Sequence, residues 1–171
     1  MDVNVVLDAL LARPPHADAA IKLWAAAEMR QIAGLVPAHG VTTLFYLFLR
    51  ARGAASARRA VADLLAVFRV AAVDQAVLQR ALALGWPDFE DAVCAAAAEA
   101  AGCNFIVTRD PAGFRGSPVP TVDPATALML FDREGGPGRL AERPRVAYAA
   151  TRKADRARGR KASSHAHRGG R

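Results

Sequence analysis

The sequence holds acidic side chains at points where a metal-dependent reaction could use them. Asp110 closes the apolar run CNFIVTRD, and Asp91 lies at the start of the alanine-rich segment that leads into that run. Ligand sites in open α/β sheets form beyond the carboxyl ends of the strands, so we expect these two acids to lie close together. Asp2 is a third candidate if a strand precedes it. Carboxylate oxygens are the ligands that Mg²⁺ and Mn²⁺ prefer, so these acids predict a divalent-metal site.

The stretch WPDFEDAV, which contains Asp91, also has a local explanation. An Asp at a helix N-cap accepts a hydrogen bond from a free backbone N–H, and acids in the first turn are stabilised by the helix dipole. This predicts Asp88 as the cap of a helix in which Asp91 is the third residue, and Asp74 as the cap of an earlier helix. The local pattern favours capping. Three like charges within one turn also repel one another, however, and a cation or a basic partner would relieve them.

The chain that must position these acids alternates helical and strand-like patterns. Its 171 residues are enough for one domain with a proper core. The alternation predicts an α/β fold with a mostly parallel sheet. Apolar spacing and turn residues predict helices over residues 3–13, 16–32, 40–53, 56–69, 75–85, 89–101 and 124–134, and strands over residues 33–39, 70–74, 103–110 and 118–123.

The positive charge of the chain belongs to its C-terminal part. The formal net charge is +7, but residues 132–171 hold 12 Lys or Arg against 4 Asp or Glu, which leaves residues 1–131 near neutrality. We therefore expect a domain over residues 1–131 and a basic, disordered tail over residues 132–171. Clustered arginines could make the tail an RNA-binding arm. We prefer a solvated tail without a selected role, because Tyr148 is its only aromatic residue for base stacking.

Apolar content and cysteine usage indicate the cellular setting. No uninterrupted apolar run approaches the roughly 20 residues that cross a bilayer, and residues 1–16 lack the basic start and small-residue cleavage site of a signal peptide. We therefore expect a cytoplasmic protein that makes no membrane contact. Cys94 and Cys103 are the only cysteines, and we expect both to be reduced packing residues.

Four segments in order resemble the PIN-domain ribonucleases, the group that includes the VapC-type toxins of bacterial toxin–antitoxin pairs. The segments are DVNVVLDALLARPPH, LVPAHGVTTLFYLFLR, GWPDFEDAV and FIVTRDPAGFRGSPVP, and the resemblance extends from residue 1 to about residue 131. It implies a three-layer α/β/α domain with a central, mostly parallel sheet. It also implies a metal-dependent endoribonuclease that uses Mg²⁺ or Mn²⁺ to activate water and to stabilise charge on the phosphate.

The resemblance assigns roles to particular residues. Asp2 matches the first acid of the family, and Asn4 matches the Asn that helps to orient it. Asp91 matches the acid of the central motif. Asp110 matches the acid that closes the TRD turn, where Thr108 could hydrogen-bond a carboxylate or water. These matches imply Asp2, Asp91 and Asp110 as both the catalytic and the metal-binding residues.

The remaining matches concern flanking positions and two departures from the family pattern. Asp88 is the helix cap and Glu90 is a flanking acid that we expect to point outward. Thr43 stands where relatives usually carry an acid; its hydroxyl could hold a metal-bound water but supplies no charge, so metal affinity should be lower or rest on the other acids. Only Met1 precedes Asp2, where the family has a central apolar strand, so either the first strand is truncated in this sequence or the sheet lacks a middle strand. We expect the true start to lie upstream, because a sheet without its middle strand would expose two strand edges.

Other polar and aromatic residues receive simpler interpretations. We expect Asp8 to be a solvent-facing helix position and His39 to belong to a turn. The run LFYLFL, residues 44–49, should be core or a dimer surface, with core preferred. Arg13, Arg50, Arg109 and Arg115 could line an RNA path, although most surface arginines need no such role.

The sequence thus supports three hypotheses. The leading one is a metal-dependent endoribonuclease that acts on RNA, is the toxin of an operon pair restrained by an antitoxin, and forms a homodimer. The alternative is a PIN-like domain that binds RNA or a partner without efficient cleavage. The least favoured is an unrelated α/β domain in which the acids serve only as caps.

Overall fold

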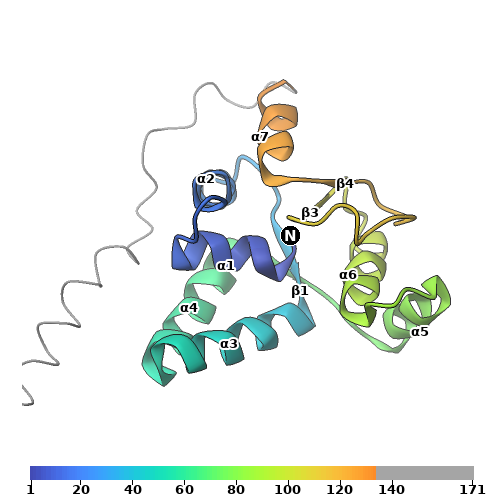
Figure 1. Ribbon diagram of the computed structural model, residues 1–171, viewed down its shortest axis with the longest axis horizontal. Helices are drawn as coiled ribbons and strands as arrows, with labels where there is room; N and C mark the ends of the chain where they lie inside the picture. The colour runs from blue at the N-terminus through green and yellow to red at the C-terminus, as the bar shows by residue number, and fades with distance from the viewer. Residues whose placement is uncertain (134–171) are drawn as a thin grey trace, which may run out of the picture.

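The computed structural model describes residues 1–133. Over this range the chain forms seven helices joined by four short strands, as Figure 1 shows. In chain order the elements are α1 (Val3–Leu11), α2 (Ala17–Glu28), β1 (Leu35–Pro37), α3 (Ala38–Arg52), α4 (Ala54–Val67), β2 (Arg69–Ala71), α5 (Gln75–Leu84), α6 (Phe89–Ala100), β3 (Ile106–Val107), β4 (Thr121–Val122) and α7 (Pro124–Arg133). Every predicted helix and strand is present, with shorter bounds for most of them.

The strands form two separate parallel pairs. β1 pairs with β2, with Val36 opposite Val70, and β3 pairs with β4, with Ile106 opposite Thr121. The α/β class and the parallel pairing agree with the sequence prediction. A single central sheet between two helical layers does not follow from these two pairs, so the three-layer arrangement stays a prediction.

The first two residues lie between the strand pairs. The amino group of Met1 donates a hydrogen bond to the carbonyl of Leu35 in β1, at 2.6 Å. The backbone N–H of Asp2 donates to the carbonyl of Val107 in β3, at 2.9 Å. Residues 1 and 2 therefore hold the place between the pairs that a middle strand of one sheet would take, and this position brings Asp2 to the end of β3.

Local chemistry accounts for where several helices begin and end. The Asp74 carboxylate accepts a hydrogen bond from the N–H of Val77 and caps α5, as predicted. Helix α5 ends at Gly85, whose φ of 67° lies in the left-handed region that glycine adopts without strain. One prediction is wrong here: His39 belongs to the first turn of α3 and not to a turn between elements, because α3 begins directly after β1.

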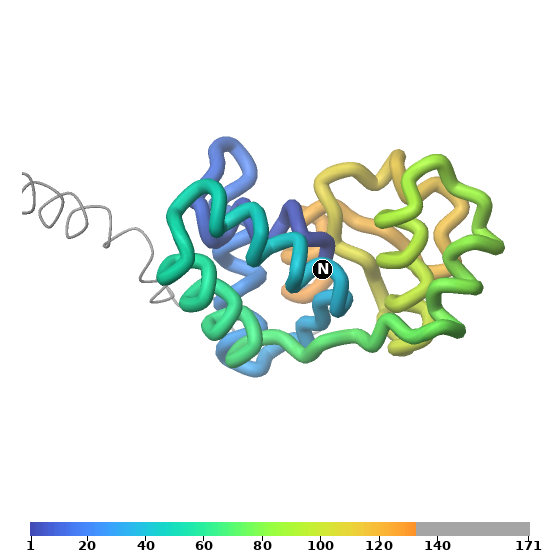
Figure 2. Tube along the Cα trace, turned by 90° about the horizontal axis from the view of Figure 1, so that it is seen from below, coloured from blue at the N-terminus to red at the C-terminus, as the bar shows by residue number. Residues whose placement is uncertain are grey.

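The apolar core consists of neighbouring clusters. The first joins α1, α2, α3 and α4, and the others lie around α5, α6, β3 and Phe114. Figure 2 shows α1–α4 on one side of the N-terminus and α5 and α6 on the other. The run of residues 44–49 divides between core and surface: Leu44 and Phe48 are buried, whereas Tyr46, Leu47 and Leu49 are exposed. The N-terminal residues and the strand ends therefore lie where the two groups of helices meet.

Two sequence predictions concern the chain outside this core. Among residues 1–133, no helix has both the length and the apolar character that spanning a membrane requires. The predicted tail begins at residue 132, but helix α7 continues through Asp132 and Arg133. The rest of that predicted tail, residues 134–171, lies outside the described residues.

Candidate functional site

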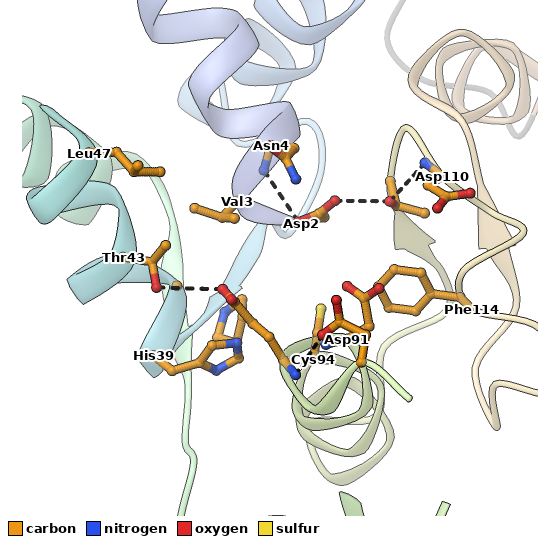
Figure 3. Close-up of a pocket in the computed structure, with 15 residues that line it drawn as sticks. Asp2, Val3, Asn4, His39, Thr43, Leu47, Asp91, Cys94, Asp110 and Phe114 are labelled. Carbon is orange, nitrogen blue, oxygen red and sulfur yellow. Dashed lines mark hydrogen bonds between the residues drawn. The ribbon is translucent and has the colours of Figure 1, made fainter. Parts of the chain in front are cut away.

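Acids from three distant segments line one pocket. This pocket has a volume of about 360 Å³ and is lined by Asp2 from the start of α1, Asp91 from α6 and Asp110 from the segment after β3. The other four residues singled out in the sequence also line it: Asn4, Thr43, Asp88 and Thr108. Figure 3 shows the labelled side chains of Asp2, Asp91 and Asp110 around this space. All seven predicted site residues are thus brought together, although their roles remain predictions.

Thr108 links two of these acids. Its hydroxyl donates a hydrogen bond to Asp2 Oδ2 at 2.9 Å and accepts one from the backbone N–H of Asp110 at 3.1 Å. Thr108 is fully buried, which is unusual for a polar side chain unless its hydrogen bonds are made. The predicted bond from Thr108 to a carboxylate is confirmed, and it joins residues 106 positions apart in the chain.

Asp2 is also the N-cap of α1. Its Oδ1 accepts a hydrogen bond from the backbone N–H of Asn4 at 3.3 Å. The resemblance implies that Asn4 orients this acid. The bond present comes from the main chain of Asn4, and the role of its side chain stays a prediction. One carboxylate oxygen of Asp2 is therefore hydrogen-bonded to the first turn of α1 and the other to Thr108. These two bonds hold the carboxylate at the N-terminus of α1.

Asp91 lies in the first turn of α6, which begins as predicted. Asp88 Oδ1 accepts hydrogen bonds from the N–H groups of Glu90 and Asp91, at 2.9 and 3.2 Å. Burial and the negative charges of Asp88, Asp2, Asp110 and Glu90 together raise the pKa of Asp91 from 3.8 to about 6. Asp88 therefore acts as a cap, while Asp91 faces the other acids.

Gly113 shows how closely two of these acids approach. A side-chain carbon at this glycine would lie 2.9 Å from Asp110 Oδ2 and 3.4 Å from Asp91 Oδ2. The two carboxylate oxygens therefore lie no farther apart than about 6.3 Å, the sum of these distances. The Gly113 N–H also donates to Asp110 Oδ1 at 3.1 Å. A glycine here keeps the space between the two acids free and helps to hold one of them.

The sequence interpretation missed two ionisable residues of the pocket that could take part in its chemistry, Glu90 and His39. Glu90, expected to point outward, is exposed but lines the pocket and accepts a hydrogen bond of 3.5 Å from the Thr43 hydroxyl. His39, expected in a turn, also lines the pocket; burial lowers its pKa, against the opposing effect of the charges of Glu90 and Asp2. The position of His39 just after β1 was the available signal, because that strand end falls under the same rule as Asp110.

Asp8 is the clearest correction, because it is completely buried and not solvent-facing. Its Oδ1 accepts from Arg13 Nε at 2.7 Å and from Arg109 Nη1 at 3.3 Å. Arg13 also donates to the carbonyl of Asn4 at 2.9 Å. Two of the four arginines that could have lined an RNA path, Arg13 and Arg109, are therefore bound to a buried acid. Because Arg109 directly precedes Asp110, the ion pair between Arg109 and Asp8 connects the Asp110 segment to α1.

An apolar side supports the acidic pocket. Cys94 and Phe114 line it, and both are buried. Burial raises the pKa of the Cys94 thiol to about 12, so this cysteine is a packing residue, as predicted for a buried thiol. The ring of Phe114 packs edge-on against Trp86, with ring centroids 5.9 Å apart. These apolar side chains share the pocket with Asp91, whose pKa is raised mainly by burial.

The donor atoms of the pocket suit a hard divalent cation. Asp2, Asp91 and Asp110 offer carboxylate oxygens, and a positive ion would relieve the repulsion that raises the pKa of Asp91. Within residues 1–133, however, no group of three or more side chains drawn from His, Cys, Asp or Glu lies close enough together to hold an ion. The chemistry of the donors fits a metal, and binding would require the carboxylates to draw closer together.

An α/β domain that gathers carboxylates at the ends of parallel strands belongs to a class suited to binding cations and phosphate groups. A family model for the PIN domain matches residues 1–112, about two thirds of the chain, and this range includes all the acids of the pocket. The chain therefore belongs to the PIN-domain family, whose members are generally nucleases that bind divalent metal ions. No curated protein and no solved structure matches it.

Proposed function

We propose that this PIN domain is a metal-dependent endoribonuclease that hydrolyses phosphodiester bonds of RNA with Mg²⁺ or Mn²⁺. The observation that carries the proposal is the meeting of Asp2, Asp91 and Asp110 in one pocket from three segments far apart in the chain. Caps alone do not require such convergence, because a capping acid serves only its own helix. The family of nucleases to which the chain belongs supports the same reaction type.

The same three acids would hold the metal. The Asp2 carboxylate is held by Thr108 and the Asp110 carboxylate by the N–H of Gly113. Asp91 would join them in its ionised form, which a metal ligand requires. The chemistry that a divalent ion supplies in such a site is activation of water and stabilisation of charge on the phosphate. The raised pKa of Asp91 implies that the site gains its full negative charge only above about pH 6.

We further propose that the enzyme is a cytoplasmic VapC-type toxin held inactive by an antitoxin, and that it forms a homodimer. The sequence motifs that resemble these toxins support this assignment. A surface feature supports a protein partner near the site: Leu47 is 39% exposed and lines the pocket, beside the exposed Tyr46 on the same helix. A partner that covered these apolar side chains would also obstruct the entrance to the acids.

The reaction is tested with RNA labelled at both ends, incubated with the full chain and Mn²⁺, with and without EDTA. Asp91→Asn is the site variant. Asp18→Asn is the matched control, because Asp18 is an exposed acid in the first turn of another helix, α2. We expect internal cleavage by the wild type and the control, and none with EDTA.

We expect Asp91→Asn to lose activity by at least about 100-fold, as metal-assisted hydrolysis requires each ligand. Equal cleavage by Asp91→Asn would refute the site. RNA binding without any cleavage by a folded wild type would favour the alternative of a PIN-like binding protein. Two observations motivate that alternative. Among the described residues, the acids do not lie close enough together to hold an ion, and Thr43 brings no charge to the pocket.

A further inference from the structure

Glu90 reaches across the pocket from α6 to α3. Its Oε1 accepts the hydrogen bond from Thr43, drawn as a dashed line from Thr43 in Figure 3. The two residues are 47 positions apart, so this contact depends on the packing of the two helices around the pocket. Glu90 and Asp91 are neighbours in the first turn of α6, yet they serve different sides: Asp91 lies near Gly113 and Asp110, whereas Glu90 lies against α3.

Glu90 shares one pocket with the acids already described. Glu90, Asp2 and Asp91 all line this pocket, and so does His39 from the first turn of α3. The Glu90 carboxylate therefore lies within the same space as the proposed ligands.

The α3 side of the pocket otherwise lacks an acid. It contributes Pro37, His39, Gly40, Thr43 and Leu47, none of which carries a negative charge. The three acids named so far come from the start of α1, from α6 and from the segment after β3. Glu90 alone brings a carboxylate to the α3 side, and its side chain is long and exposed enough to move toward a cation at little cost.

We propose that Glu90 is a fourth carboxylate ligand of the metal site and that Thr43 is the residue that positions it. This proposal rests on the proposed function for the identity of the bound group, a divalent metal ion. It adds a donor to acids that, within residues 1–133, are not gathered closely enough to hold an ion. Glu90 would turn toward the ion by rotation of its own flexible side chain, because its hydrogen bond to Thr43 is 3.5 Å long. The other carboxylates would still have to draw closer together.

The test measures Mn²⁺ binding to the full chain by calorimetry and by the loss of the free-ion electron paramagnetic resonance signal. The variants are Glu90→Gln, which removes the charge and keeps the shape, and Thr43→Val, which removes the hydroxyl. Glu28→Gln is the control, because Glu28 is an exposed acid at the end of α2. Thermal unfolding in EDTA verifies that each variant is folded.

We expect Mn²⁺ affinity to fall at least about tenfold in Glu90→Gln, as is typical when the shell of a metal site is damaged. Thr43→Val should lose roughly threefold, the scale of one hydrogen bond, and Glu28→Gln should bind as the wild type does. Thr43→Glu combined with Glu90→Gln moves the carboxylate to the other side of the same space. This double variant should recover most of the affinity, which a purely structural role of Glu90 would not predict.

Two of the possible outcomes separate this proposal from the proposed function. Unchanged Mn²⁺ affinity in Glu90→Gln, while the wild type still cuts RNA, would overturn the role of Glu90 alone. Weakened affinity in a protein that cuts no RNA would support Glu90 and refute the nuclease. A folded wild type that binds no Mn²⁺ would overturn both.

Discussion

Replacing Asp91 by Asn should stabilise the metal-free protein at neutral and alkaline pH while abolishing its proposed activity. Burial and four neighbouring carboxylates raise the pKa of Asp91 from 3.8 to about 6. Below pH 3.8 the group is protonated in both the folded and the unfolded chain, so the substitution should change little. As pH rises toward 6 the unfolded chain releases this proton first, and the folded state becomes progressively less stable. Above about pH 6, the ionised Asp91 lowers the stability of the folded protein by its full amount.

The size of the effect follows from the difference between the two pKa values. A pKa unit corresponds to about 1.4 kcal/mol, so the difference between 3.8 and about 6 sets an upper bound of about 3 kcal/mol. Asp91 is only partly buried, and solvent screening reduces this figure to about 1 kcal/mol. Loss of the favourable helix-dipole interaction in the first turn of α6 offsets a few tenths of a kcal/mol, roughly. The net gain should raise the melting temperature by about 2–4 °C.

The assay is thermal or urea unfolding in EDTA, across the range from about pH 4.5 to about pH 8. Asp18→Asn serves again as the control, since it removes an acid from the first turn of α2 and should not gain stability as pH rises. When Mn²⁺ is added, the wild type should become more stable than Asp91→Asn, because the wild type then gains binding free energy that the variant lacks. If Asp91→Asn is no more stable than the wild type at about pH 8 in EDTA, the electrostatic reasoning is refuted.

Two further predictions concern residues around the acids. Gly113→Ala should fold but displace the Asp110 carboxylate, because the added carbon would lie 2.9 Å from Asp110 Oδ2. We expect Mn²⁺ affinity to fall about tenfold, with little change in stability against urea. Unchanged Mn²⁺ affinity would contradict this geometry. Asp8→Asn should lower the free energy of unfolding by about 2 kcal/mol, less than for a fully buried ion pair because Arg13 and Arg109 are partly exposed. Urea titration measures this loss, and a variant as stable as the wild type would show that the network contributes nothing.

Local sequence sufficed for the helices and their caps. Asp74 and Asp88 bind N–H groups within three residues of themselves, so their roles depend only on one turn of chain. The candidate acids Asp2, Asp91 and Asp110 could also be named from the sequence, because strand ends and family-like motifs mark them. The seven-residue set that this reasoning produced lines a single pocket.

Tertiary structure decided which side chains the pocket and the core actually use. Asp8 looks like a surface residue in sequence, yet it is buried, because Arg109, 101 positions away, and Arg13 compensate its charge. Glu90 looks like a flanking acid, yet α3 brings Thr43 to it. The sequence by itself determined the helices, the caps and the acids that could bind a metal. The fold decided their partners, because the charge and hydrogen-bond balance of a buried or converging group depends on residues that only packing brings near.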